Sequence, residues 1–73
     1  MTDDLRPAGV FRDLSTDRAT RAAILTDAAL SVDEFASKHG PTIRQHYAKG
    51  GYQMDMEEGH QTAAKLWRYL REP

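Results

Sequence analysis

Residues 31–51 read SVDEFASKHGPTIRQHYAKGG and contain several helix start and stop signals in succession. Ser31 followed by Glu34 forms a capping box, in which each side chain bonds to the other residue's backbone amide at the beginning of a helix. Gly40 can adopt the left-handed conformation that ends a helix, and Pro41 suits the first turn of the next one. These signals predict two short helices with a tight turn between them.

The two short helices are expected over 32–39 and 41–49, and a longer helix is expected on either side of them. Good N-cap residues predict a helix over about 15–30, and residues 1–13 show no clear period and are expected to form an irregular arm. In the C-terminal segment apolar residues recur at intervals of four and three, as in an amphipathic helix. They are Met56, His60, Ala63, Trp67 and Leu70. Since no segment alternates as a strand does, the predicted fold is all-α, a small bundle of about four helices.

A chain of 73 residues is expected to form one domain, because single cores usually grow to roughly 100–150 residues before a chain divides. No apolar run approaches the roughly 18 residues that a membrane span needs. Residues 1–4 are acidic where a signal or transit peptide would be basic. We therefore expect a single helical domain over 1–73 that is cytoplasmic and has no membrane partner.

Neither metal binding nor catalysis is predicted from the residues. The chain has no cysteine, which excludes disulfides, zinc–thiolate sites and a cysteine nucleophile. His39, His46 and His60 form no pair at the spacings of a helical metal site. We expect two partly exposed histidines, with His60 at the edge of the core, no metal, no cofactor and no enzymatic activity.

Positive charge gathers in the middle of the chain. Ten Lys and Arg against eleven Asp and Glu give a net charge of −1, yet residues 35–54 contain no acidic residue. This window holds Lys38, Arg44 and Lys49, a local charge of about +3 that suits a modest anion-binding patch. An ordinary solvated helix face explains the same residues.

Four segments of the chain are similar to segments of a known family. They are FRDL at 11–14, the helix over 19–29, LSVDEFA at 30–36 and TIRQHYA at 42–48. Together they resemble the C-terminal end of phage-type tyrosine recombinases, with residues 61–70 in the place of the family's trailing helix. The resemblance puts Tyr47 at the nucleophile's position, but the family's catalytic His and Arg fall on Arg12 and Ser15. Because a tyrosine nucleophile needs nearby cations, the resemblance implies a catalytically inactive remnant with a DNA-facing or partner-facing surface.

The central region also matches a helix-turn-helix. Ala36 and Gly40 stand four apart, as the motif's helix contact and turn glycine require. Ile43 follows Gly40 by only three residues, so the predicted helix-turn-helix-like pair is compressed. The helix over 41–49 would then recognise nucleic acid, with Tyr47 supporting it from the core. The residues expected to contact nucleic acid, through phosphates or base edges, are Lys38, Thr42, Arg44, Gln45 and Lys49.

Two functions remain open. The first is a small, non-catalytic, integrase-like DNA-binding or transcription-regulatory protein of phage or mobile-element type, which places helix 41–49 against double-stranded DNA as a homodimer. The second is an adaptor or inhibitor that docks on a larger enzyme or transcription component through the Trp67 face or the 35–54 surface. The residues expected at a partner or dimer interface are Met56, Trp67 and Leu70. The near-neutral charge favours the second function, and the local basic patch favours the first.

Overall fold

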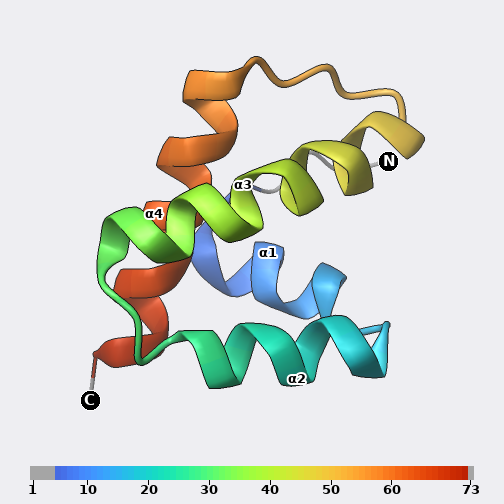
Figure 1. Ribbon diagram of the computed structural model, residues 1–73. Coiled ribbons are helices and arrows are strands. Elements are labelled where there is room, and N and C mark those ends of the chain that lie inside the picture. Colours follow the sequence, from blue (N-terminus) through green and yellow to red (C-terminus); the bar gives the residue numbers. More distant parts are fainter. Residues whose placement is uncertain (1–4, 73) are drawn as a thin grey trace.

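Four helices make up residues 5–72, the part of the chain that a computed structural model describes (Figure 1). In chain order they are α1 (Pro7–Leu14), α2 (Arg18–Asp27), α3 (Val32–Lys49) and α4 (Met56–Arg71). Among these residues there is no strand, so the all-α fold class with four helices is confirmed. None of the four helices is long and apolar enough to cross a membrane.

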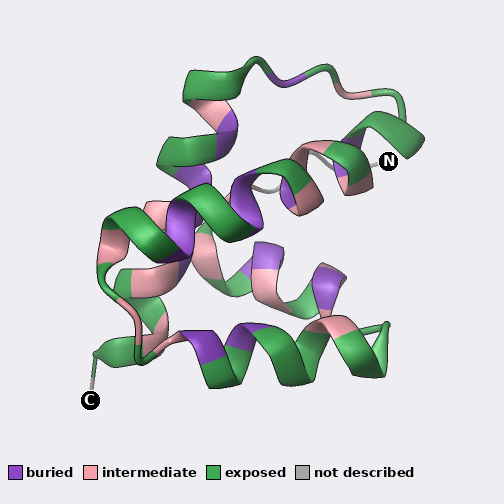
Figure 2. Ribbon diagram, in the orientation of Figure 1, coloured by how far each residue is buried: buried purple, intermediate pink, exposed green. Residues whose placement is uncertain are grey.

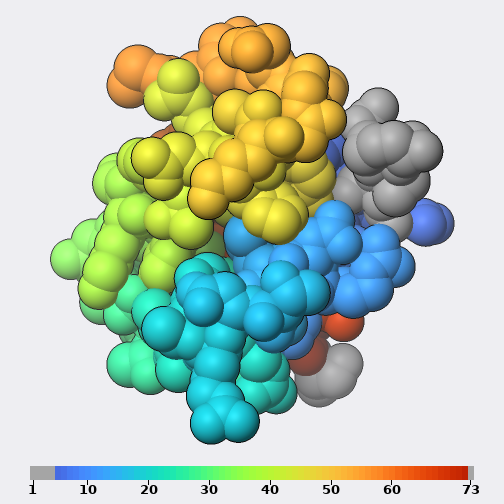
Figure 3. Space-filling view, turned by 90° about the vertical axis from the view of Figure 1, so that its right-hand side faces the viewer, coloured from blue at the N-terminus to red at the C-terminus, as the bar shows by residue number. Residues whose placement is uncertain are grey.

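The core forms where α3 crosses α4, and α1 and α2 close it from below. α3 and α4 make the most extensive contact, whereas α1 lies against both α4 and α2. Figure 2 shows the buried residues on the sides of the helices that face one another. Seen from the right-hand side of Figure 1, the end of α1 and the start of α2 fill the space below the last turns of α3 (Figure 3). The buried apolar residues are Val10, Leu14, Ile24, Phe35, Ala36, Ile43, Tyr47, Met54, Ala63 and Leu66.

The turn predicted at Gly40 and Pro41 does not exist, because α3 is one continuous helix through both residues. The helix begins at the predicted capping box and ends at the predicted glycine pair. Four residues at intervals of four form one buried stripe that passes through the predicted break; they are Phe35, His39, Ile43 and Tyr47. Fully burying a Phe or Ile side chain contributes roughly 1.5–3 kcal/mol, so the stripe offsets the roughly 3 kcal/mol that an interior proline costs. The compressed helix-turn-helix is therefore wrong.

Gly40 is also the residue type that best tolerates a following proline inside a helix. A proline ring collides with the Cβ of the preceding residue and drives that residue out of the helical region. Gly40 has no Cβ, so this collision is reduced. The same dipeptide that reads locally as a stop and a start is thus compatible with a single helix.

The N-terminal arm is also more ordered than predicted. Its first four residues lie outside the described part, but 7–14 form α1, with Pro7 at the first helical position where its missing amide costs nothing. Val10 and Leu14, one turn apart, are buried in the core. The next helix begins at Arg18 instead of residue 15 or 16, because the side chain of Asp17 accepts a hydrogen bond from the amide of Thr20.

α4 turns a different face to the core from the one predicted. Its buried residues are Gly59, Thr62, Ala63 and Leu66. Of the predicted stripe, Ala63 is buried, Trp67 and Leu70 are half-buried, and Met56 and His60 are exposed. The reason is Gly59, which α4 directs toward α3. Compared with the predicted orientation, the helix is rotated about its axis so that Leu66 faces the core.

The two helices touch through their backbones at this point. A Cβ built on Gly40 would lie 3.7 Å from the carbonyl carbon of Gly59. A Cβ on Gly59 would lie 2.5 Å from Cγ and 2.7 Å from Cδ of Arg44, since the stem of that arginine covers the glycine. The side chain of Arg44 is held there by a hydrogen bond from Nε to the carbonyl oxygen of Met54, at 3.3 Å.

The two glycines should therefore respond differently to alanine. Gly40→Ala should change the free energy of unfolding little, because the roughly 0.5–1 kcal/mol that alanine gains in a helix is offset by the collision of its Cβ with the ring of Pro41, while the α3–α4 crossing itself leaves room for the methyl group. Gly59→Ala should leave the protein about 1–2 kcal/mol less stable than Gly40→Ala, because it overpacks the crossing. Urea unfolding followed by far-UV circular dichroism measures both. Adding Arg44→Ala to Gly59→Ala should remove the penalty; an unchanged penalty would show that the crowding of Arg44 is not its cause.

Candidate functional site

The basic residues predicted to meet phosphates are partly engaged within the protein. Nζ of Lys38 lies 2.9 Å from Oδ2 of Asp27 in α2. Arg44 is half-buried and donates to the carbonyl oxygen of Met54. Of the three predicted cations, Lys49 alone is exposed with no side-chain partner among the described residues.

The structure brings some of the predicted contact residues together and separates others. Thr42, Arg44 and Gln45 line one shallow hollow with residues of the α3–α4 loop. Lys49 follows Gln45 by one turn on the exposed side of α3. Lys38 lies elsewhere, because its side chain turns toward α2. Only part of the predicted set therefore shares a surface.

A buried polar cluster joins α2 to α3. Nε2 of His39 lies 2.8 Å from Oδ2 of Asp27, the same oxygen that Lys38 approaches, and the ring of His39 lies 4.7 Å from that of Phe35 between centroids. The hydrogen bonds from Lys38 and from His39 hold the pKa of the Asp27 carboxyl below its ordinary value. Only 5% of His39 is exposed, and its contact with Asp27 links α3 to α2.

Two predictions about the histidines are wrong. His39 was expected to be partly exposed and is buried, whereas His60 was expected at the core edge and is exposed. Asp27 and His39 belong to different helices, so no local spacing marks them as partners. The sequence carried one signal for the burial of His39, which lies four residues from both Phe35 and Ile43.

A hollow of about 250 Å³ lies between α3 and α4, beside the point where Gly40 and Gly59 meet. It is lined by Ala36, Ser37, Gly40, Pro41, Arg44, Met56 and His60, and we call it the α3–α4 groove. Met56 is 75% exposed at its edge. The groove exists because small residues at the crossing leave space beside a close helix contact.

The three residues predicted for a partner or dimer interface have different environments. Met56 is open to solvent, while Trp67 and Leu70 are packed against the core at the other end of α4. Nε1 of Trp67 donates to the carbonyl oxygen of Leu30 at 2.8 Å, and the guanidinium of Arg71 lies 4.9 Å from the ring centroid. Trp67 and Leu70 therefore contribute to the fold, and Met56 is the most exposed of the three.

Tyr47 is a core residue, as predicted. It is 7% exposed, and its hydroxyl donates to Oδ2 of Asp13 at 3.1 Å.

Within residues 5–72 no group of three or more His, Cys, Asp or Glu is placed to hold a metal ion. No protein-family model, curated protein or solved structure matches the chain. The similarity to tyrosine recombinases stays a prediction.

The Asp27 cluster makes stability depend on acidity. Because the pKa of Asp27 is lower in the folded protein than the ordinary 3.8, its stabilising contribution is complete above about pH 5 and is lost as pH falls through the folded pKa. Asp27→Asn should lower stability at pH 7, since it replaces the charged acceptor of Lys38 and His39. The difference in stability between Asp27→Asn and the unmodified protein should be smaller at pH 3 than at pH 7. The urea midpoints of both proteins at the two pH values measure it.

Asp33→Asn is the matched control, because Asp33 is an exposed carboxyl of the first turn of α3. It should change the midpoints little at either pH. If Asp27→Asn and Asp33→Asn gave the same pH dependence, Asp27 would not be the source of the acid sensitivity.

Proposed function

We propose that this protein is a small, non-catalytic adaptor or inhibitor that binds a partner protein through the α3–α4 groove. The observation that carries the proposal is the exposure of Met56 beside a hollow with apolar lining. The partner would be a protein that presents an apolar side chain from an amphipathic helix. Laying such a helix into a groove is a common mode of peptide recognition.

Met56 differs from the other exposed large apolar residues. Leu25 and Tyr69 are each 43% exposed, against 75% for Met56. Exposure of Met56 is not a result of a loose helix end, because the side chain of Asp55 caps α4 by accepting a hydrogen bond from the amide of Glu58 at 2.7 Å. An unbranched methionine can adjust its shape to a partner, and methionine is common on surfaces that bind helices.

The lining of the groove suits one large apolar side chain with polar groups around it. Pro41 supplies apolar surface from α3, and Met56 supplies it from α4. Ser37 and His60 line the same hollow and can hydrogen-bond to a partner's backbone or polar residues. Burying one leucine-sized side chain there would contribute roughly 1.5–3 kcal/mol to binding.

Photocrosslinking in cells of the source organism tests this proposal. A benzophenone amino acid replaces Met56 in one variant and Leu25, on α2, in a control variant. The variant at 56 should give a discrete crosslinked protein that the variant at 25 does not give. Adding Ser37→Arg, which places a large charged side chain in the groove, should abolish that product.

The result is interpretable in either direction. A product that survives Ser37→Arg, or equal products from positions 56 and 25, would exclude the groove as the binding site. Both labelled positions and Ser37 are exposed, so each variant is expected to fold. Circular dichroism of each variant checks this.

DNA binding through α3 is the second candidate, as a cytoplasmic transcription regulator of phage type that acts as a homodimer. Gln45 and Lys49 favour it, because both are exposed one turn apart and suit a base edge and a phosphate. The engagement of Lys38 and Arg44 within the protein weakens it.

Fluorescence anisotropy with a labelled duplex tests this second candidate. If α3 contacts DNA, Gln45→Ala with Lys49→Ala should weaken binding about tenfold or more at about 50 mM salt, because one phosphate contact and one base contact are lost. Unchanged affinity in the double variant would exclude α3 as the DNA-binding element.

A further inference from the structure

A second hollow lies next to the α3–α4 groove, between the start of α3 and the middle of α4. Its volume is about 410 Å³, and we call it the Lys65 hollow. Its walls include Val32 and Asp33 from α3 and His60, Ala64, Lys65 and Arg68 from α4. His60 also lines the groove, and the two α3 residues come one turn before the groove residues Ala36 and Ser37. The two hollows are therefore adjacent and form one longer surface.

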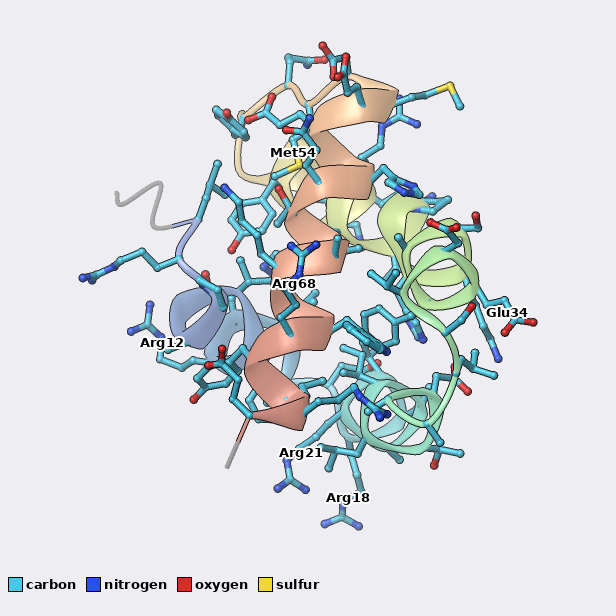
Figure 4. All side chains as sticks on the ribbon, turned by 90° about the vertical axis from the view of Figure 1, so that its left-hand side faces the viewer. Arg12, Arg18, Arg21, Glu34, Met54 and Arg68 are labelled. Atoms are coloured by element: carbon cyan, nitrogen blue, oxygen red, sulfur yellow. The ribbon has the colours of Figure 1, made fainter. Side chains whose placement is uncertain are left out.

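Lys65 and Arg68 bring two positive charges to the Lys65 hollow. Both residues are exposed, and neither side chain makes a hydrogen bond or an ion pair with another residue of the described part of the chain. They are three residues apart on α4, an interval that places both side chains on one face of a helix. Figure 4 shows Arg68 projecting from α4. These two cations are thus available to an incoming acidic group.

The carboxylates around the Lys65 hollow do not cancel this charge. Asp33 lines the hollow, and Glu72 follows Arg68 by one turn at the end of α4. Against these two acids stand three cations, because Arg71 lies one turn after Arg68. The ammonium of Lys65 and the guanidinium of Arg68 therefore face a deficit of negative charge.

The other acids of α3 and α4 are too far away or point elsewhere. Glu57 and Glu58 precede Lys65 by about two turns, roughly 10 Å or more, which exceeds the Debye length of about 8 Å at physiological salt. Glu34 extends from the side of α3 that is turned away from α4 (Figure 4). Val32 is the first helical residue of α3, so the positive end of that helix dipole also borders the hollow.

We propose that the partner helix of the α3–α4 groove continues into the Lys65 hollow and places a carboxylate against Lys65 and Arg68, an inference that rests on the proposed function. A guanidinium can bind a carboxylate through two parallel hydrogen bonds, and the neighbouring ammonium supplies a further charged donor. The partner would be an amphipathic helix whose acidic residue and apolar anchor share one face.

The geometry of α4 sets the spacing of these two partner residues. The α4 side of the groove is formed by Met56 and His60, and Lys65 and Arg68 follow this pair by about eight residues, which is two helical turns or roughly 12 Å. A partner helix that lies along α4 matches this distance with an Asp or Glu about seven or eight positions from its apolar anchor.

Photocrosslinking from a second position tests the extension of the site. Gln61 is exposed and lines the Lys65 hollow but not the groove. A benzophenone amino acid at 61 should therefore capture the same protein as the label at Met56. Mass spectrometry of the two crosslinked peptides should place both attachment points in one segment of that protein, with an Asp or Glu within about one turn of the point reached from position 61.

Charge reversal tests the carboxylate. Lys65→Glu with Arg68→Glu should lower the yield of the product from position 56 roughly tenfold, because the partner's carboxylate then meets two like charges. Arg18→Glu with Arg21→Glu is the matched control and should leave the yield unchanged. It reverses two exposed cations of α2, which lie at the bottom of Figure 4 and line neither hollow.

A milder variant guards against loss of the fold, since glutamate near the C-terminus of α4 opposes the helix dipole. Lys65→Gln with Arg68→Gln removes both charges without reversing them and should lower the same yield severalfold. Circular dichroism of every variant checks that it is folded.

The possible failures of the two proposals are distinguishable. Absence of any product from position 56 that Ser37→Arg abolishes would reject the proposed function and this inference together. Such a product from position 56, with none or a different protein from position 61, would overturn this inference alone. Equal yields in the folded Lys65 and Arg68 variants and in the α2 control would likewise exclude a carboxylate contact in the Lys65 hollow.

Discussion

The backbone contact between α3 and α4 at Gly40 and Gly59 determines the rest of the arrangement. Two glycines allow the helices to approach closely, with the stem of Arg44 packed on Gly59, and Ile43 and Leu66 are then buried on either side. The groove beside Met56 is the space that the absent side chains leave open. Fold and candidate binding site therefore have the same physical origin.

The helical class, the capping box of α3 and its end at the glycine pair follow from local chemistry and could be predicted. The break at Pro41 could not be judged locally, because its cost is offset by burial of Phe35 and Ile43 against other helices. The face of α4 was misjudged for a similar reason: Gly59 counts as inward-facing only once α3 lies against it. Likewise, the groove and the Asp27 cluster join residues from different helices, so no spacing in the chain predicts them.

The distribution of charge shows why a sum over the chain is a poor guide to its partners. A cation matters for binding only when it is not already paired, and α3 uses Lys38 and Arg44 for its own packing. The arginines of α1, α2 and α4 have no comparable internal role, with the exception of Arg71, which donates to the carbonyl oxygen of Ala28.

The contact of Trp67 has a practical consequence. It is the only tryptophan of the chain, and its indole N–H is bonded to the backbone where α2 gives way to α3. Its fluorescence emission is therefore an intrinsic reporter on the docking of the C-terminal turns of α4. Because the groove residues lie toward the opposite end of that helix, the emission follows undocking of these turns separately from occupancy of the groove.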